Sequence, residues 1–173
     1  VGPPERGGLN GFYSQLNRNK RCIALDLKTD GGREIAQRLA QDADVVIQNF
    51  RPGVADRLGI GYEELSRDNP GLVYVSVSGF GPDGPYSSQP VYDLVIQGMS
   101  GLLPDQGGKG NKPEMLKSVI ADKATAITAA SSALAALLAR ERNNGQGQHV
   151  QVPMINAFAQ LALADGMSPE TFV

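Results

Sequence analysis

Residues 44–78 read DVVIQNFRPGVADRLGIGYEELSRDNPGLVYVSVS, and this segment indicates the fold class. It begins with a short apolar run, DVVIQNF (44–50), and ends with another, LVYVSVS (72–78), both rich in valine as buried parallel strands are. The segment between them has the pattern of two short helices that stop at Pro70 and Gly71. Strand, helix and strand in this order predict a crossover unit with two parallel strands.

The region on the N-terminal side of this unit predicts one more strand and one more helix. RCIALDL (21–27) alternates apolar and polar residues, which is the pattern of a strand. TDGGREIAQRLAQDA follows, with Ile35 and Leu39 four residues apart on one helical face. Thr29 or Asp30 is expected to cap this helix.

The C-terminal side continues the alternation of helices and strands. The elements expected there are a helix over 91–103, a loop over 104–115, an alanine-rich helix over 119–143, a strand over 148–154 and a last helix in INAFAQLALADG. Gly145 can adopt the left-handed conformation that ends the long helix. The sequence therefore predicts an α/β fold, a parallel sheet with helices on its faces.

Composition excludes several classes of function. The chain has 173 residues, 41% of them hydrophobic and 20% charged, which is enough for one domain with a core. Its net charge of -2 gives no positive field for nucleic acid or for an anionic membrane surface. No apolar run is long enough for a membrane helix, and no signal peptide is recognisable, so we expect a cytoplasmic protein.

The single cysteine, Cys22, and the single histidine, His149, limit the chemistry further. One cysteine cannot form an internal disulfide, and the two residues together do not make a usual zinc site, so no metal is expected. A Ser-His-Asp arrangement would need His149, which falls in the alternating strand pattern HVQV, and no G-x-S-x-G elbow occurs. Cys22 in RCIAL has the setting of a small core residue rather than of a nucleophile.

The string GFGPDG (79–84) matches G-x-G-x-x-G directly after a predicted strand. A dinucleotide site needs a helix to leave this loop, because the pyrophosphate rests on the helix N-terminus. Here Pro82, Pro85 and Pro90 follow, and prolines disfavour a helix. The string is therefore interpreted as a loop and not as an NAD site.

Asp122 is the most unusual carboxylate of the chain. It lies near the start of the long alanine-rich helix, which is expected to be mostly buried. There, free backbone N–H groups and the positive end of the helix dipole would stabilise its charge. Small neighbours would let a bulky substrate approach. The alternative is an ordinary helix-capping aspartate with Lys123 as an exposed neighbour.

Basic residues gather in NRNKR (17–21) and at Lys28, Arg51 and Arg57. Lys28 and Arg51 follow predicted strands, where α/β folds place their ligand sites. Arginine and lysine in such positions suit phosphate groups. Ordinary solvated surface charge is the alternative.

Taken together, five strings resemble motifs of the class III CoA-transferases, the family that includes formyl-CoA transferase, carnitine CoA-transferase and α-methylacyl-CoA racemase. They occur in the family order and cover nearly the whole chain: LNRNKRCIALDLKTDGG, ADVVIQNFRPGVADRLGIGYEEL, NPGLVYVSVSGFGPDGPY, YDLVIQGMSGL and ADKATAITAASSALAALLARERNNGQGQHVQVPM.

This resemblance implies a large domain with a Rossmann-like sheet, a smaller second domain and two subunits threaded through each other as interlocked rings. Residues 1–173 would form only part of the large, CoA-binding domain. The family's N-terminal strand and helix, its small domain and its C-terminal return to the large domain would lie outside this stretch.

The resemblance also implies the chemistry. The aspartate that opens the alanine-rich helix in the family matches Asp122. In transferases this residue attacks an acyl-CoA thioester to give an aspartyl acyl anhydride, and CoA thiolate then converts the anhydride to an aspartyl-CoA thioester. The acceptor acid finally takes over the CoA. A carboxylate is a competent nucleophile toward such an activated acyl group.

Coenzyme A, as part of the acyl-CoA substrate, is the ligand that the resemblance implies. The family's CoA-binding positions match Leu25 to Lys28, Arg57 and two short groups: Asn49, Phe50 and Arg51, and Val91, Tyr92 and Asp93. The three cations would meet the nucleotide phosphates, and Phe50 would offer an apolar surface.

Two other functions are weighed beside CoA transfer. Racemase members carry a histidine before the aspartate that matches Asp93, but this chain has Tyr92 there, and its histidine lies far along the chain at position 149. Racemisation by two bases would therefore lack its usual histidine, so CoA transfer is preferred over racemisation. The second alternative is an inactive CoA-binding module.

Overall fold

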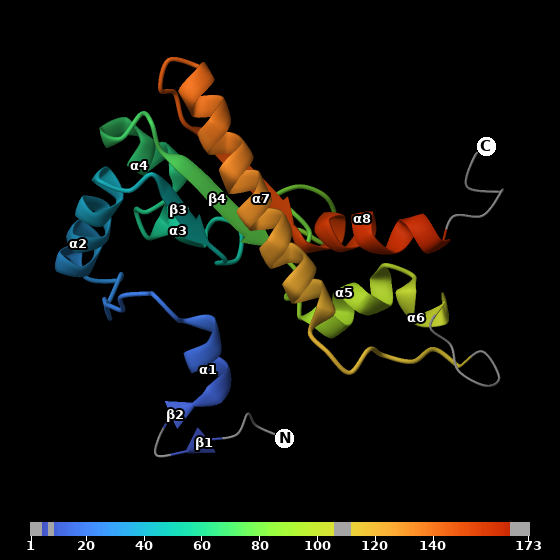
Figure 1. Cartoon of the computed structure of the whole chain (residues 1–173). Coiled ribbons are helices and arrows are strands. Elements are labelled where there is room, and N and C mark those ends of the chain that lie inside the picture. The colour runs from blue at the N-terminus through green and yellow to red at the C-terminus, as the bar shows by residue number, and fades with distance from the viewer. Residues whose placement is uncertain (1–4, 7–8, 106–111, 167–173) are drawn as a thin grey trace.

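The computed structural model describes residues 5–6, 9–105 and 112–166, and Figure 1 shows its elements. The strands are β1 (Glu5–Arg6), β2 (Leu9–Asn10), β3 (Val45–Gln48), β4 (Val73–Ser78) and β5 (Gln148–Pro153). The helices are α1 (Gly11–Leu16), α2 (Asp30–Gln41), α3 (Val54–Arg57), α4 (Tyr62–Asp68), α5 (Asp93–Met99), α6 (Leu102–Asp105), α7 (Ile120–Arg142) and α8 (Met154–Gly166). None of the helices in these ranges is long and apolar enough to cross a membrane.

Three parallel strands form the central sheet, in the order β3-β4-β5. Two register pairs, Val45 with Val73 and Tyr74 with His149, show how the strands align. The strands β1 and β2 form a separate antiparallel pair. This arrangement confirms the predicted α/β, Rossmann-like fold with helices between parallel strands.

Each face of the sheet is covered by different helices. Val73 and Val75 of β4 are fully buried against alanines of α7. On the opposite face Tyr74 packs with Ala40 of α2 and Leu65 of α4. Small alanine side chains let the long helix lie close to the sheet, and Figure 1 shows α7 crossing it diagonally.

The direction of α7 follows from contacts at its end. The Arg140 guanidinium donates to the carboxylate of Asp44 at 2.9 Å and to the carbonyl of Gly71 at 3.1 Å. Asp44 precedes β3 and Gly71 precedes β4, so the C-terminal end of α7 lies at the amino ends of the strands. The helix therefore begins at the opposite edge, where parallel α/β sheets bind their ligands.

Most predicted element boundaries are confirmed, including both short helices after β3. Thr29 is the N-cap of α2, with its hydroxyl accepting from the N–H of Gly32. Gly145 has a φ of 77°, and its N–H donates to the Arg140 carbonyl, as expected for a left-handed residue after a helix.

The prediction of a strand over 21–27 is wrong. These residues follow an irregular path, and within the described residues no other strand pairs with them. An alternating pattern needs a neighbouring strand to supply the hydrogen bonds of a ladder. The helix predicted after this segment is present as α2. Its two apolar residues Ile35 and Leu39 lie on one face, but their side chains are 41% and 56% exposed, so within the described residues this face is not fully covered.

The single helix predicted over 91–103 is two helices, α5 and α6. Gly101 between them has a φ of 81°, a left-handed conformation that interrupts the helix. The loop predicted over 104–115 lies in part outside the described residues.

The string over 79–84 is a loop, as predicted, and the next helix starts only at Asp93. Gly81 and Gly84 have φ angles of 86° and 91°, which glycine adopts without steric cost. Because no helix begins at the glycines, the helix N-terminus that a pyrophosphate would need is missing from this loop.

Candidate active site

Asp122 occupies the third position of α7. The N-cap is Val119, whose side chain makes no capping hydrogen bond, so the interpretation of Asp122 as the capping residue is wrong. Asp122 is also exposed, although the helix that carries it was expected to be mostly buried. Its helix is buried along one face only, with Ile127 and Leu134 among the side chains that face outward.

The start of α7 is capped from a different helix. The Asp93 carboxylate, at the first position of α5, accepts the backbone N–H of Asp122 through Oδ2 at 3.0 Å. Only 5% of Asp93 is exposed. A buried carboxylate thus satisfies one of the N–H groups that every helix start leaves without a partner inside the helix.

Gln97 holds this carboxylate in place. It is fully buried, and its Nε2 donates to Asp93 Oδ1 and, at 3.0 Å, to the carbonyl of Ser118. Its Oε1 accepts the N–H of Leu116 at 3.1 Å. The Gln97 side chain therefore connects α5 to the segment that leads into α7, and so fixes the start of the helix that carries Asp122.

The same surroundings change the electrostatics of Asp122. Partial burial, together with the negative charge of Asp93, raises the pKa of the Asp122 carboxyl above its ordinary value. The helix start alone would lower this pKa. Because the pKa is raised, the ionised carboxylate of Asp122 is less well stabilised than that of a free aspartate.

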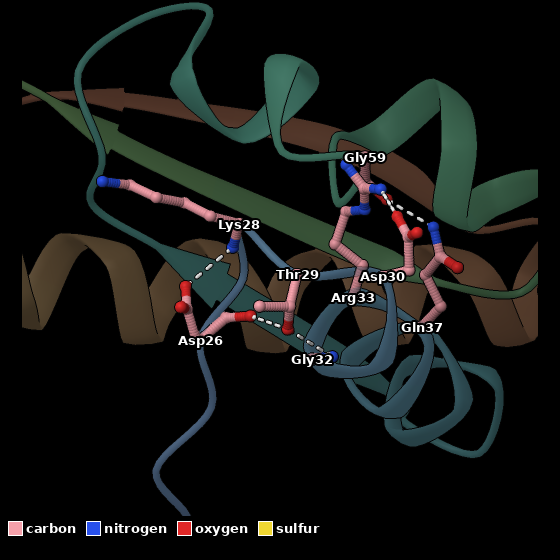
Figure 2. A network of polar contacts seen from close by, with 8 residues as sticks. All are labelled: Asp26, Lys28, Thr29, Asp30, Gly32, Arg33, Gln37 and Gly59. Atoms are coloured by element: carbon pink, nitrogen blue, oxygen red, sulfur yellow. Dashed lines mark hydrogen bonds and ion pairs between the residues drawn. The ribbon is translucent and has the colours of Figure 1, made fainter.

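The turn before α2 shapes the segment from Leu25 to Lys28 (Figure 2). The Asp26 carboxylate accepts the N–H of Lys28 at 3.0 Å, and the Asp26 carbonyl accepts the Thr29 hydroxyl at 2.8 Å. A side chain on Gly32 would collide with that same carbonyl, so glycine is required there. Figure 2 shows the Lys28 side chain extending away from α2, and Leu25 is half-buried.

A second set of contacts in Figure 2 ties α2 to the turn after α3. Gln37 Nε2 donates to the Gly59 carbonyl at 2.7 Å, while Arg33 pairs with Asp30 within α2. Since Gly59 comes two residues after Arg57, this contact joins the structures that carry Lys28 and Arg57.

Among the described residues, the cations predicted to bind phosphate have no acidic partner. Lys28, Arg51 and Arg57 are exposed, and none of them forms an ion pair within the part of the chain that the structure describes. Lone cations at the surface are available for an anionic ligand, whereas cations in ion pairs would first have to leave their partners.

Residues 49–51 leave β3 at the ligand-binding edge of the sheet. The side chain of Phe50 is 39% exposed and lines a cavity of about 180 Å³. Asn49 and Arg51 on either side of it are exposed. Asp122 does not line this cavity, and no hydrogen bond among the described residues joins Asp122 to this segment.

The three residues predicted around the start of α5 have different surroundings. Val91 packs against the core cluster around Ile96 and Phe158, and Asp93 is buried beneath α7. Tyr92 is 78% exposed. Of this group, only the Tyr92 side chain is open to a ligand in solution.

The structure thus brings Asp93 next to Asp122, and Arg51 follows β3 at the edge of the sheet where α7 begins. Sequence reasoning missed Gln97 and its contact with Ser118. The signal was a glutamine four residues after an aspartate in an otherwise apolar helix, since that spacing puts both side chains on one face.

Similar sequences are found among CoA-transferases. The family model described as "CoA-transferase family III" matches residues 1–170. The chain is 40% identical to the acetyl-CoA:oxalate CoA-transferase of Acetobacter aceti, over 96% of this chain and 44% of that protein. It is 41% identical to the formyl-CoA:oxalate CoA-transferase of Streptomyces avermitilis, over 87% of this chain and 36% of that protein.

Solved structures show the same similarity. A CAIB/BAIF family protein from Brucella suis superposes with a TM-score of 0.84 at 36% identity, over 96% of this chain and 46% of that one. The chain therefore spans less than half the length of the relatives that it matches. Since the family model matches almost the whole sequence, the chain belongs to CoA-transferase family III.

Proposed function

We propose that the polypeptide containing these residues transfers CoA from an acyl-CoA to a carboxylic acid, with Asp122 as nucleophile. The observation that carries this proposal is the setting of Asp122. Its carboxylate is exposed, its backbone is held by Asp93, and its pKa is raised. In its ionised form, a carboxylate that its surroundings stabilise less is a stronger nucleophile than an ordinary one.

In the first step, an Asp122 oxygen attacks the thioester carbonyl. The carbon–sulfur bond breaks, CoA leaves as a thiolate, and an aspartyl acyl anhydride remains. The thiolate then attacks the aspartyl carbonyl and releases the donor acid as its carboxylate. The acceptor carboxylate attacks the aspartyl thioester in the same way, and CoA thiolate completes the exchange by attacking the acyl carbonyl of the new anhydride. Each step exchanges one acyl bond for another, so the energy of the thioester is kept.

We further propose that Lys28, Arg51 and Arg57 hold the phosphates of CoA, while Asn49 and Phe50 contact its uncharged parts. Their exposure and the absence of ion pairs among the described residues support this assignment. Leu25, Val91 and Asp93 would act mainly by shaping the backbone, because their side chains are partly or fully covered.

The resemblance extends the proposal to the whole protein. Residues 1–173 would form part of a large CoA-binding domain in a cytoplasmic, interlocked homodimer. The location of His149 supports transfer over racemisation. It lies on the face of the sheet opposite to α7, where it contacts Ser76, so it is not placed to share a proton with Asp122.

An isotope-exchange assay tests this function. The polypeptide is incubated with an acyl-CoA and a labelled free acid, and label in the acyl-CoA pool is measured. We expect exchange in the wild type and none in Asp122→Asn, with Asp42→Asn as the exposed control that keeps activity. Exchange by Asp122→Asn, or deuterium uptake at the α-carbon without exchange, would contradict the proposal.

A further inference from the structure

A chain of polar side chains crosses the central sheet on the face opposite to α7. Gln48 of β3 lies beside Ser76 of β4 in the strand register, and its Nε2 donates to Ser76 Oγ at 3.0 Å. Ser76 Oγ lies 2.8 Å from Nε2 of His149 on β5. The three residues connect all three strands of the sheet.

The direction of each hydrogen bond in this network can be assigned by starting from the backbone of Phe50, which follows β3. The N–H of Phe50 can only donate, and it donates to Gln48 Oε1 at 2.7 Å. Gln48 Nε2 is then the donor toward Ser76. The single hydroxyl proton of Ser76 is therefore free to point at His149, whose Nε2 accepts it as part of a neutral ring.

The surroundings of His149 agree with this assignment. The ring stacks on Tyr62 with centroids 5.1 Å apart and meets Tyr74 edge-on at 5.3 Å. Burial lowers the pKa of His149, while Asp56 and Glu63 oppose the change. A neutral, packed ring is a fixed acceptor at the end of the chain.

Gln48, at the opposite end of this hydrogen-bond network from His149, restrains the segment that follows β3. The Gln48 side chain accepts the backbone N–H of Phe50, which restrains the segment from Gln48 to Phe50. We propose that Gln48, Ser76 and His149 are positioning residues that set the conformation of Asn49, Phe50 and Arg51 for binding CoA. This inference rests on the proposed function.

CoA binding by the intact polypeptide tests the inference. Gln48→Met removes the hydrogen bonds of Gln48 with Phe50 and Ser76 at similar side-chain length, and Ser76→Ala removes those of Ser76 with Gln48 and His149. We expect each to raise the Kd for CoA about three- to tenfold, as the loss of one net hydrogen bond would. The kcat should stay unchanged, because Asp122 is held by a separate network.

Three comparisons make the result decisive. Ser76→Thr keeps the hydroxyl and should bind CoA like the wild type. Gln41→Met, a surface control, should also have no effect. The double variant of Gln48→Met and Ser76→Ala should be no weaker than the worse single variant, because both break one chain.

The outcomes separate the two proposals. Wild-type Kd values in Gln48→Met and Ser76→Ala would overturn the positioning role while leaving CoA binding intact. A fall in kcat at unchanged Kd would also overturn it. A wild type that does not bind CoA would refute the proposed function and this inference together. Should Ser76→Ala fail to fold, Gln48→Met decides alone, since Gln48 is only half-buried.

Discussion

Replacing Asp93 with alanine should loosen the start of α7. The substitution removes the acceptor of the Asp122 N–H, which is partly buried, and one acceptor of Gln97, which is fully buried. Gln97 keeps its bond to the Ser118 carbonyl, so part of the network survives. Hydrogen bonds to a charged group contribute about 1.5–3 kcal/mol each, and we expect a loss of about 2–4 kcal/mol in the free energy of unfolding.

Asp93→Asn should lower the free energy of unfolding by less, about 1–2 kcal/mol. The amide oxygen can still accept one hydrogen bond, whereas the amide nitrogen is a donor and cannot accept from the Nε2 of Gln97. Urea unfolding, with the slope compared between variants, measures these differences. Asp68→Ala is the matched control, an exposed aspartate whose removal should change stability by less than about 0.5 kcal/mol. An Asp93→Ala variant as stable as Asp68→Ala would refute the claim that Asp93 holds the helix.

Three further predictions concern the helix start, the turn before α2 and the cations. Asp122→Asn should be more stable than the wild type at neutral pH, because the raised pKa means that the ionised carboxylate is unfavourable in the folded state. This advantage should shrink as pH falls through the raised pKa toward 3.8, and an advantage that grows with acidity in chemical unfolding experiments would be inconsistent with it. Gly32→Ala should lose about 1–3 kcal/mol of stability through collision with the Asp26 carbonyl, whereas Gly31→Ala, which faces open space, should stay within about 1 kcal/mol of the wild type in the same unfolding assay. Arg57→Gln should raise the Kd for CoA about three- to tenfold at low salt and less at high salt in calorimetry, and a salt-independent effect would argue against a phosphate contact.

The sequence predicted the sheet and most helices well, because their patterns are local. Valine-rich runs and the alanine-rich stretch need no knowledge of neighbours to be recognised. The prediction of a strand over 21–27 failed for the opposite reason. The alternating pattern suits a strand, but a strand needs a neighbouring strand as hydrogen-bond partner, and the described residues contain no such partner for this segment. Gly101 breaks a helix that composition alone would continue.

The position of Asp122 near the start of α7 was predictable from the sequence, but its environment was not. Its exposure depends on which face of α7 packs on the sheet, and the capping group comes from 29 residues earlier in the chain. Gln97 and Gln48 were missed because a glutamine gives no local sign of the distant backbone it will bind. Such contacts arise from tertiary packing.

On the proposed mechanism, Asp122 forms a covalent bond first with the acyl group and then with CoA. The intact polypeptide is incubated with an acyl-CoA, hydroxylamine is added to trap the activated aspartyl carbonyl, and peptides are analysed by mass spectrometry. We predict a hydroxamate on Asp122 that depends on acyl-CoA and is missing in the Asp122→Asn variant. CoA exchange that proceeds at full rate without any label on Asp122 would contradict the account.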